Sequence, residues 1–277
     1  MSNLFRFLSC LPLWALHALG SVMGWMVYGI SADYRQRLNW QAELAGLSPA
    51  QRRKSIAAAG QMVGELPRLW FGRAVPIEWD GAECVDAALA TDRGLIFLTP
   101  HLGCFEVTAQ AYALRYGSVR RPMTVLYRPA RKVWLRALVE HARQRPGLGT
   151  APATLVGVKQ MLKALRGGGA VGLLPDQVPP QGLGVWAEFF GRPAYTMTLP
   201  FRLAAQTGAT VLLAWGERLP WGRGYVVHVR PLRIDLDSVP VTAAEQINTA
   251  MEALIRERPE QYLWGYDRYK SPREGRS

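Results

Sequence analysis

A short apolar run passes directly into polar residues at Gly94-Leu95-Ile96-Phe97-Leu98-Thr99-Pro100-His101-Leu102-Gly103-Cys104-Phe105-Glu106. The apolar part, residues 94–100, is too short for a stable helix, and its composition is typical of a buried strand. In open α/β sheets, ligands bind beyond the carboxyl ends of the strands. His101 follows this strand at once, so the sequence predicts that its imidazole lies at a ligand-binding edge.

The same alternation continues along the chain. Short apolar runs predict four further strands, at Met123–Tyr127, 170–175, 210–215 and 225–229. Helical stretches separate them, at 104–116, 131–143, Leu155–Arg166 and 199–206. The pattern favours an α/β fold with helices on both faces of one sheet, in a single catalytic domain.

Local signals predict where some helices begin and end. Capping boxes at residues 48–51 and 242–245 predict two further helix starts. Three consecutive glycines at residues 167–169 predict the end of a helix.

The composition excludes several classes of protein. Hydrophobic residues make up 49% and charged residues 19% of the 277 residues, which excludes disorder, collagen and coiled coil. Lys and Arg number 33 against 21 Asp and Glu, and the net charge of +12 indicates an anionic partner: nucleic acid, an acidic protein or phosphate-bearing lipid. Cys10, Cys84 and Cys104 form neither a disulfide framework nor a zinc spacing, which favours a reducing compartment. Because His and Cys do not cluster, no metal or other cofactor is expected.

The beginning of the chain is strongly apolar. No charged residue stands between Arg6 and Asp33, and residues 7–30 would form a helix of roughly 36 Å, enough to cross about 30 Å of hydrocarbon. We expect a retained membrane anchor here. A cleaved signal peptide and a buried globular helix are the alternatives.

The chain therefore divides into a membrane anchor helix, residues 1–30, and one catalytic domain, residues 31–277. Arg35 and Arg37 follow the apolar run at once, and later basic residues lie on the same side. The positive-inside bias therefore predicts that the catalytic domain faces the cytoplasm.

His101 and Glu106 suggest a general-base pair. If His101 lies in the loop and Glu106 one turn inside the following helix, the carboxylate can reach back and accept the imidazole N–H. That contact would fix the tautomer and leave the other ring nitrogen as a base, which suits acyl transfer to a poorly nucleophilic hydroxyl. Two alternatives stay open here: a structural histidine with satisfied hydrogen bonds, and a nucleophilic Cys104 thiolate beside the histidine.

Six ordered blocks are similar to the lipid A late acyltransferases of Gram-negative bacteria, within the broader group of lysophospholipid and glycerolipid acyltransferases. The blocks are residues 94–106 with their His-x4-acid pattern, Tyr127-Arg128-Pro129, Ala142-Arg143-Gln144-Arg145, Leu174-Pro175-Asp176-Gln177, Phe189-Phe190-Gly191-Arg192-Pro193 with Thr196 and Thr198-Leu199-Pro200, and Pro259-Glu260-Gln261-Tyr262-Leu263-Trp264 with Arg268-Tyr269-Lys270. The resemblance covers nearly the whole chain. It implies one glycerolipid-acyltransferase-like domain, a mixed β-sheet flanked by helices, preceded by an N-terminal membrane-anchoring helix.

The resemblance also implies a function. It predicts an O-acyltransferase of the bacterial inner membrane that moves a fatty acyl chain from an acyl carrier protein or CoA thioester to a hydroxyl of a lipid A precursor. A lysophospholipid or aminolipid acceptor is one alternative, and a catalytically inactive membrane-anchored lipid-binding protein is another. The chain departs from the family pattern at Cys104-Phe105, Leu199 and Tyr266, which leaves the acceptor and the acyl-chain length open.

The resemblance assigns site residues one by one. His101 and Glu106 are predicted to catalyse direct transfer without an acyl-enzyme. The predicted substrate-binding residues are Arg128, Arg143, Arg145, Asp176 and Gln177. Arg143 would hold phosphate or stabilise the oxyanion, Arg128 would assist at the phosphate, and Asp176 would order the site. Surface salt bridges and a loop-capping aspartate are the structural alternative.

A basic stretch supports an anionic ligand. Its cations, set against Glu140 alone, are Arg115, Arg120, Arg121, Arg128, Arg131, Lys132, Arg136, Arg143 and Arg145. Arginine binds phosphate bidentately and suits the acidic surface of acyl carrier protein. The apolar N-terminus and the lack of a nucleic-acid module argue against nucleic acid, and part of this charge is expected to face anionic lipid.

Overall fold

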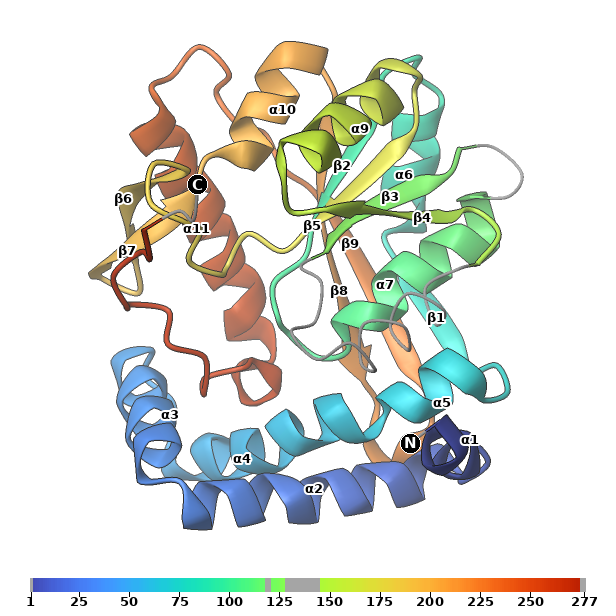
Figure 1. The fold of residues 1–277 in the computed structure, drawn as a ribbon, viewed down its shortest axis with the longest axis vertical. Helices are drawn as coiled ribbons and strands as arrows, with labels where there is room; N and C mark the ends of the chain where they lie inside the picture. The colour runs from blue at the N-terminus through green and yellow to red at the C-terminus, as the bar shows by residue number, and fades with distance from the viewer. Residues whose placement is uncertain (1, 118–120, 128–144, 275–277) are drawn as a thin grey trace.

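The fold is built on one mixed β-sheet. The computed structural model describes residues 2–117, 121–127 and 145–274. The strands in this part of the chain are β1 (Ile77–Asp80), β2 (Leu95–Leu98), β3 (Met123–Tyr127), β4 (Leu148–Pro152), β5 (Ala170–Leu173), β6 (Gly184–Phe189), β7 (Arg192–Met197), β8 (Thr210–Arg218) and β9 (Tyr225–Pro231). Seven of them form a sheet in the order β1-β9-β8-β2-β5-β3-β4 (Figure 1). Its neighbours are parallel except for the antiparallel pair β8 and β9, and β6 and β7 form a separate hairpin.

Helices surround this sheet. The described α-helices are α1 (Ser2–Ser9), α2 (Leu13–Ile30), α3 (Ala32–Leu44), α4 (Pro49–Gly64), α5 (Leu66–Phe71), α6 (Ala82–Leu89), α7 (Phe105–Tyr112), α9 (Leu155–Arg166), α10 (Leu199–Thr207) and α11 (Pro240–Glu257). Shorter turns are η1 (Ala113–Gly117), which is π-helical, and the 3-10 turns η2 (Pro220–Gly222) and η3 (Pro259–Gln261).

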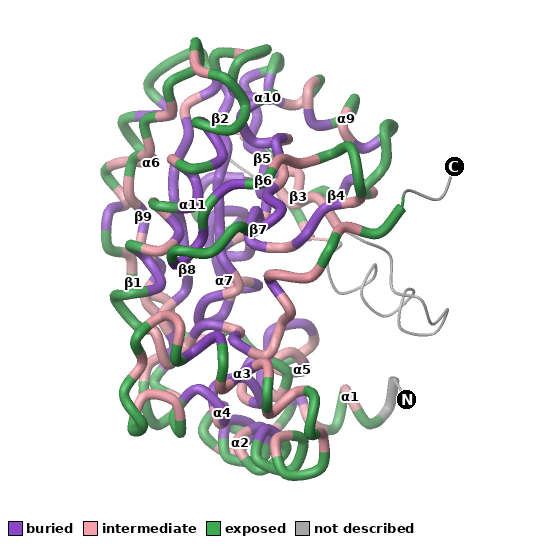
Figure 2. The backbone as a smooth tube through the Cα atoms, turned by 90° about the vertical axis from the view of Figure 1, so that its left-hand side faces the viewer, coloured by how far each residue is buried: buried purple, intermediate pink, exposed green. Residues whose placement is uncertain are grey.

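β2 lies in the middle of the sheet and is buried on both faces. Side chains alternate between the two faces of a strand, so its residues divide between two cores. Leu95 and Phe97 pack with α5, α6 and α7, whereas Ile96 and Leu98 pack with α3, α4, α9, α10 and α11. Helices therefore cover both faces, as the strand and helix alternation predicted, and Figure 2 shows the buried backbone running through the upper part of the molecule.

Most of the predicted elements are confirmed. The five predicted strands correspond to β2, β3, β5, β8 and β9, and three of the predicted helices to α7, α9 and α10. The α-helix predicted over residues 104–116 ends at Tyr112 and continues as a π-helical turn. α9 ends at Arg166, directly before the three glycines. The helix predicted over residues 131–143 lies outside the described residues.

The two capping-box predictions have different outcomes. Ser48 caps α4 through reciprocal hydrogen bonds with Gln51, as predicted. The box predicted at Thr242 is wrong, because α11 begins earlier, at Pro240. Proline is favoured at the first helical position, where its fixed φ is already helical and its missing N–H is not needed.

The apolar N-terminal run forms two helices. It breaks at Pro12, and α2 has 18 residues, or roughly 27 Å of helix. α2 lies lengthwise against α4 (Figure 1). Their backbones meet at glycines: a Cβ on Gly20 would lie only 2.7 Å from the carbonyl oxygen of Gly60. α2 is thus packed into the fold, and its role as a membrane anchor stays a prediction.

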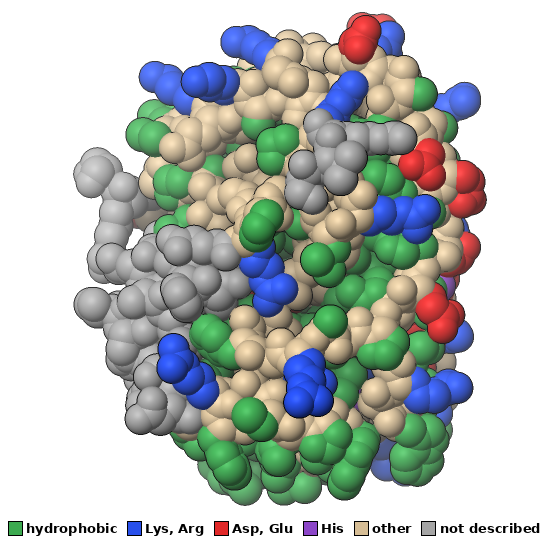
Figure 3. Space-filling view, turned by 90° about the vertical axis from the view of Figure 1, so that its right-hand side faces the viewer, with side chains coloured by type: hydrophobic (Ala, Val, Ile, Leu, Met, Phe, Trp, Pro, Cys, Tyr) green, Lys and Arg blue, Asp and Glu red, His purple; other side chains and the backbone are tan. Residues whose placement is uncertain are grey.

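The other face of α2 is exposed and apolar. Its exposed large hydrophobic side chains are Trp14, Leu19, Val22, Met23, Trp25, Met26, Val27 and Ile30. By length and composition alone, α2 could cross a membrane. Figure 3 shows hydrophobic side chains gathered along the lower edge of the molecule, where α2 lies.

Candidate active site

The loop after β2 holds His101 at the carboxyl edge of the sheet. Gly103 has a left-handed backbone, with φ of 59°, and a side chain there would overlap the carbonyl oxygen of Gly216 on β8. The same oxygen accepts a hydrogen bond of 2.8 Å from the Cys104 N–H. On the other side, the Leu263 N–H donates to the carbonyl oxygen of His101 at 3.0 Å. The loop is therefore fixed between β8 and the C-terminal segment.

Asp176 holds His101 by two hydrogen bonds. It lies in the turn after β5, the strand next to β2. Its Oδ1 is 2.8 Å from Nδ1 of the imidazole, and its Oδ2 accepts a bond of 2.8 Å from the backbone N–H of His101. Nε2 of Gln177 lies 3.1 Å from Nε2 of the same imidazole. These partners assign the proton to Nδ1 and leave Nε2 as the basic nitrogen, which accepts from the Gln177 amide.

The electrostatics of this pair suit a base. Asp176 is only 3% exposed. Burial raises the pKa of its carboxyl, but the charge of His101 and the hydrogen bonds from its ring and backbone hold the pKa below its ordinary value. Asp176 therefore stays ionised at neutral pH and can stabilise an imidazolium that forms when Nε2 takes a proton.

Glu106 lies in the first turn of α7, as predicted, and is buried. The hydrogen bond that the sequence assigned to it is made by another residue, because the Nδ1–H of His101 points to Asp176. The reason is topological: β2 and β5 are parallel neighbours, so the turns that follow them meet at one edge. Asp176, predicted to bind substrate, orients the imidazole instead. The catalytic role of Glu106 stays a prediction.

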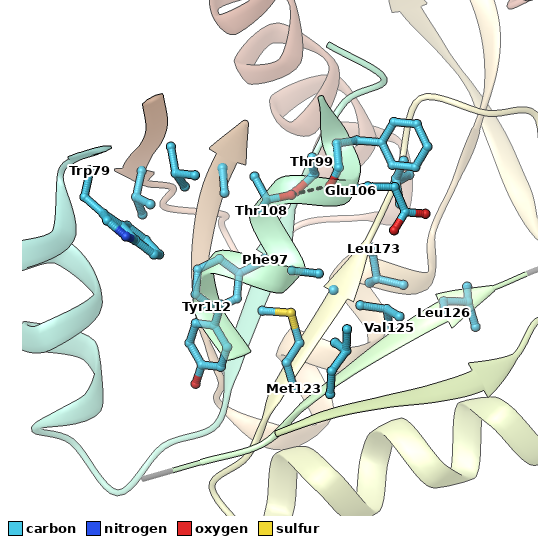
Figure 4. Close-up of a pocket in the computed structure, with 18 residues that line it drawn as sticks. Trp79, Phe97, Thr99, Glu106, Thr108, Tyr112, Met123, Val125, Leu126 and Leu173 are labelled. Atoms are coloured by element: carbon cyan, nitrogen blue, oxygen red, sulfur yellow. Dashed lines mark hydrogen bonds between the residues drawn. The ribbon is translucent and has the colours of Figure 1, made fainter. Parts of the chain in front are cut away.

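An apolar cavity begins beside the pair. The ring centroid of Phe105 lies 5.1 Å from that of His101, and Phe105 and Glu106 both line the cavity. The cavity runs between α7 and the sheet, and its walls are mainly aliphatic and aromatic. Figure 4 shows Glu106 at one end of the lining, with Trp79 and Tyr112 at the opposite end. Such a lining suits a hydrocarbon chain.

Arg145 brings positive charge to the same region. Its Nη2 donates to the carbonyl oxygens of Leu69 and, at 3.3 Å, Trp70, near the end of α5. Burial lowers the pKa of Arg145, whereas the nearby Glu106 carboxylate raises it. Arg145 is therefore a cation close to the Glu106 end of the cavity.

Only part of the predicted basic stretch belongs to the described residues. The predicted phosphate ligands Arg128 and Arg143 lie outside them. Arg121 donates to the carbonyl oxygen of Arg93 at 2.7 Å, and the guanidinium carbon of Arg115 lies 5.4 to 5.6 Å from two aromatic ring centroids. These two cations contact their own chain.

The geometry also bears on the alternative of a Cys104 nucleophile. The Cys104 thiol is 1% exposed, and burial first, then the nearby Glu65 carboxylate, raises its pKa well above the ordinary value. A buried thiol that is held protonated is a poor nucleophile, which argues against the Cys104 alternative. Among the described residues, no group of three His, Cys, Asp or Glu side chains could hold a metal ion.

Sequence reasoning missed a buried ion pair that supports the loop. Arg218 at the end of β8 donates to both carboxylate oxygens of Glu65 at 2.7 Å, and to the carbonyl oxygen of Gly103 at 3.1 Å. His17 on α2 and Tyr225 on β9 also contact Oε2 of Glu65, at 3.1 and 2.9 Å. Because these residues lie far apart in sequence, no local pattern signals them.

A histidine at the carboxyl edge of an α/β sheet, beside an apolar cavity, suits an enzyme whose substrate carries a hydrocarbon chain. The comparison with known families specifies which. The model of the bacterial lipid A biosynthesis acyltransferase family matches residues 3–271, and the chain belongs to that family. It is an acyltransferase of lipid A biosynthesis, with a lipid A precursor as acceptor and an acyl donor.

Individual relatives agree with this assignment. The chain is 28% identical over 240 residues to a lipid A biosynthesis lauroyltransferase of Escherichia coli, covering 83% of this chain and 76% of the relative. It is 28% identical over 200 residues to a lipid A biosynthesis acyltransferase of Haemophilus influenzae, covering 72% and 60%. It is 25% identical over 245 residues to a lipid A biosynthesis palmitoleoyltransferase of E. coli, covering 83% and 76%.

Proposed function

We propose that the chain transfers a fatty acyl group directly from a thioester to a hydroxyl of a lipid A precursor, with His101 as general base. The observation that carries this proposal is the His101–Asp176 pair beside an apolar cavity, one of whose lining residues, Phe105, has its ring centroid 5.1 Å from that of His101. The pair supplies a correctly oriented base, and the cavity supplies a site for a hydrocarbon chain next to it.

The reaction is a single displacement. Nε2 of His101 takes the proton of the acceptor hydroxyl while its oxygen attacks the thioester carbonyl carbon. The C–S bond then breaks, and the leaving thiolate receives the proton from the imidazolium. Asp176 keeps the proton on Nδ1 and stabilises the positive ring during the reaction. A base in this position contributes roughly 10²–10⁴-fold to the rate.

Glu106 and Arg145 are proposed to act at the same end of the cavity. Glu106 is a buried carboxylate next to Phe105, whose ring lies close to His101. Its negative charge would favour the imidazolium without a direct hydrogen bond. Arg145 supplies a cation for a phosphate group of the acceptor or donor. Gln177, bonded to Nε2 of His101, would yield that position to the acceptor hydroxyl.

The fatty acyl chain is proposed to lie in the apolar cavity, with its thioester carbonyl at the His101 end. Acyl carrier protein is the proposed donor, and CoA is the alternative. The net charge of +12 favours either donor, because both are anionic.

The proposed location is the inner membrane, with the catalytic domain on the cytoplasmic side. α2 packs on α4 along one face and exposes an apolar face on the other. We infer that α2 lies along the membrane surface with this face in the lipid, because crossing the bilayer would separate it from α4. The acceptor lipid would then reach His101 without leaving the membrane.

Purified protein in vesicles tests the chemistry. We expect His101→Ala to lower the rate of acylation of a lipid A precursor from an acyl carrier protein thioester by 10²–10⁴-fold. Mass spectrometry of the product would give the mass of one added acyl group. A wild-type rate for His101→Ala would contradict the mechanism.

The same assay distinguishes the substrates. Parallel reactions with acyl-CoA identify the donor, and parallel reactions with a lysophospholipid identify the acceptor. Acylation of the lysophospholipid alone would contradict the proposed acceptor and leave the His101 mechanism in place.

A further inference from the structure

The η2 turn between β8 and β9 carries an exposed tryptophan in an unfavourable backbone conformation. Trp221 has φ of 61° and ψ of 22°, in the left-handed region that favours glycine. Its side chain is 87% exposed, the highest value among the large hydrophobic residues that the structure describes. An exposed aromatic side chain at a strained position calls for a reason outside the folding of the turn.

Phe190 provides the contrast. Within the described residues it is the other non-glycine residue with positive φ, at 48°. Phe190 is 6% exposed, and its ring packs against Phe189 and Trp264. Its conformation is compensated by packing. Trp221, with most of its surface exposed, has no comparable compensation from the described chain.

The turn lies directly on the beginning of α2. A Cβ on Gly222 would lie 2.8 Å from Cα of Trp14, so the backbones of the two segments are in contact. Trp14 is itself 60% exposed and begins the apolar outer face of α2. Figure 1 shows the lower ends of β8 and β9 reaching this end of α2. Trp221 therefore extends the apolar face of α2 onto the sheet.

The chemistry of this surface fits a lipid bilayer with anionic headgroups. Neither the turn at residues 219–224 nor residues 4–30 contains an Asp or Glu, whereas Arg223 stands two residues after Trp221 and is exposed. Tryptophan favours the membrane–water interface, and arginine beside it suits anionic lipid. A protein partner would be expected to present carboxylates to this cation as well as an apolar pocket.

We propose that Trp221 inserts into the membrane interface as a second contact, in addition to α2. This inference rests on the membrane location given under the proposed function. The contact has a consequence for the site, because β8 leads from this turn to Gly216, whose carbonyl oxygen fixes the loop of His101. Trp221 would thus set the height of the catalytic loop above the lipid surface.

Binding of the full chain to vesicles of phosphatidylcholine and phosphatidylglycerol tests the proposal, with Trp221→Gly as the variant. Glycine is favoured at positive φ, so this variant should melt at the wild-type temperature or above it. We expect its vesicle affinity to fall on the order of tenfold. The difference in tryptophan fluorescence between the wild type and Trp221→Gly is the contribution of Trp221. Brominated lipid should quench this contribution.

Trp186→Ser is the matched control, because Trp186 is half exposed on β6, in the separate hairpin. Its affinity should equal that of the wild type. Wild-type affinity of Trp221→Gly, or an equal loss in both variants, would overturn the proposal. Failure of the wild type itself to bind vesicles would contradict the proposed membrane location as well. Acyl transfer measured in detergent tests the proposed chemistry separately.

Discussion

His101 can act as a base at Nε2 only while its proton is held on Nδ1. Asp176 accepts that proton at 2.8 Å and is bound in turn by the backbone N–H of the same histidine. The carboxylate is therefore fixed relative to the ring by two bonds, and its burial prevents water from competing for it. At the residue scale, the proposed catalysis depends on the charge of Asp176 as well as on its shape.

The substitution Asp176→Asn separates charge from shape. The amide has nearly the same size but cannot stabilise an imidazolium, and it can select the wrong tautomer, so we expect kcat to fall roughly 10²–10⁴-fold with a similar KM. Glu106→Gln should lower kcat less, because Nδ1 of His101 keeps its hydrogen bond to Asp176. Steady-state kinetics with the acyl thioester measures both. A fully active Asp176→Asn beside an inactive Glu106→Gln would reverse the assignment of the two carboxylates.

Glu65 makes stability depend on pH. Burial raises the pKa of its carboxyl, but the charge and hydrogen bonds of Arg218, with those of His17, lower it from 4.5 to about 2. A carboxyl with a lowered pKa in the folded state contributes its full stability above its ordinary pKa and loses it as the pH falls. We expect the free energy of unfolding to decrease between about pH 4.5 and about pH 2.

Glu65→Gln checks this prediction. It leaves Arg218 without its counter-ion in a buried site, so we expect a loss of roughly 3–5 kcal/mol at neutral pH and a weaker acid dependence. Denaturant unfolding at several pH values measures both. Glu78→Gln, at an exposed position on β1, is the control and should leave the dependence of the unfolding free energy on pH unchanged. If the free energy of unfolding of Glu65→Gln fell at acid pH as much as that of the wild type, the assignment of this pH dependence to Glu65 would be refuted.

At the scale of elements, the contact between α2 and α4 depends on glycines. A side chain on Gly60 would overlap the backbone of Gly20, so Gly60→Ala must push the helices apart. We expect it to lower the free energy of unfolding by roughly 1–3 kcal/mol. Gly29→Ala, on α2 but with open space around it, should be neutral or slightly stabilising. Thermal unfolding in detergent compares them, and equal melting temperatures would show that the helices are not in close contact.

Local sequence signals predicted the central elements better than the edges. β2 and β5 are continuous apolar runs, buried on both faces, and α9 has glycines at its end. The edge strand β1 alternates half-buried and exposed residues, and the other edge strand, β4, contains glycine and proline. Both exist because a neighbouring strand offers unpaired backbone groups, which is a property of the assembled sheet.

At the scale of the whole molecule, the site is a product of topology. The sequence predicted His101 at a strand end because the apolar run and the imidazole are contiguous. It did not predict the bond from His101 to Asp176, because this bond depends on β5 lying next to β2. The Glu65–Arg218 pair likewise connects segments that only the complete fold brings together. Contacts within a segment can be predicted from the local sequence, whereas contacts between segments can be predicted only once the strand order is known.

The cavity, as the proposed binding site of the acyl chain, connects this topology to the choice of acyl chain. Val227 on β9 lines it and lies opposite Trp79 on β1, which Figure 4 shows at the end far from Glu106. A larger side chain at Val227 would fill that far end and leave the His101 end unchanged. We therefore expect Val227→Phe to shift the preferred acyl donor to a shorter chain, while the rate with the shorter donor stays within a few-fold of wild type.

Val226→Phe offers a matched control, since Val226 is the preceding residue on β9 and its side chain lies on the opposite, half-exposed face. Reaction of each variant with a series of acyl carrier protein thioesters, analysed by mass spectrometry of the acylated lipid, gives the chain-length profile. Overpacking in Val227→Phe is expected to cost about 1–3 kcal/mol, so melting temperatures are measured alongside. An unchanged profile in a folded Val227→Phe would mean that the acyl chain binds elsewhere, because a chain lying in this cavity must meet the new ring.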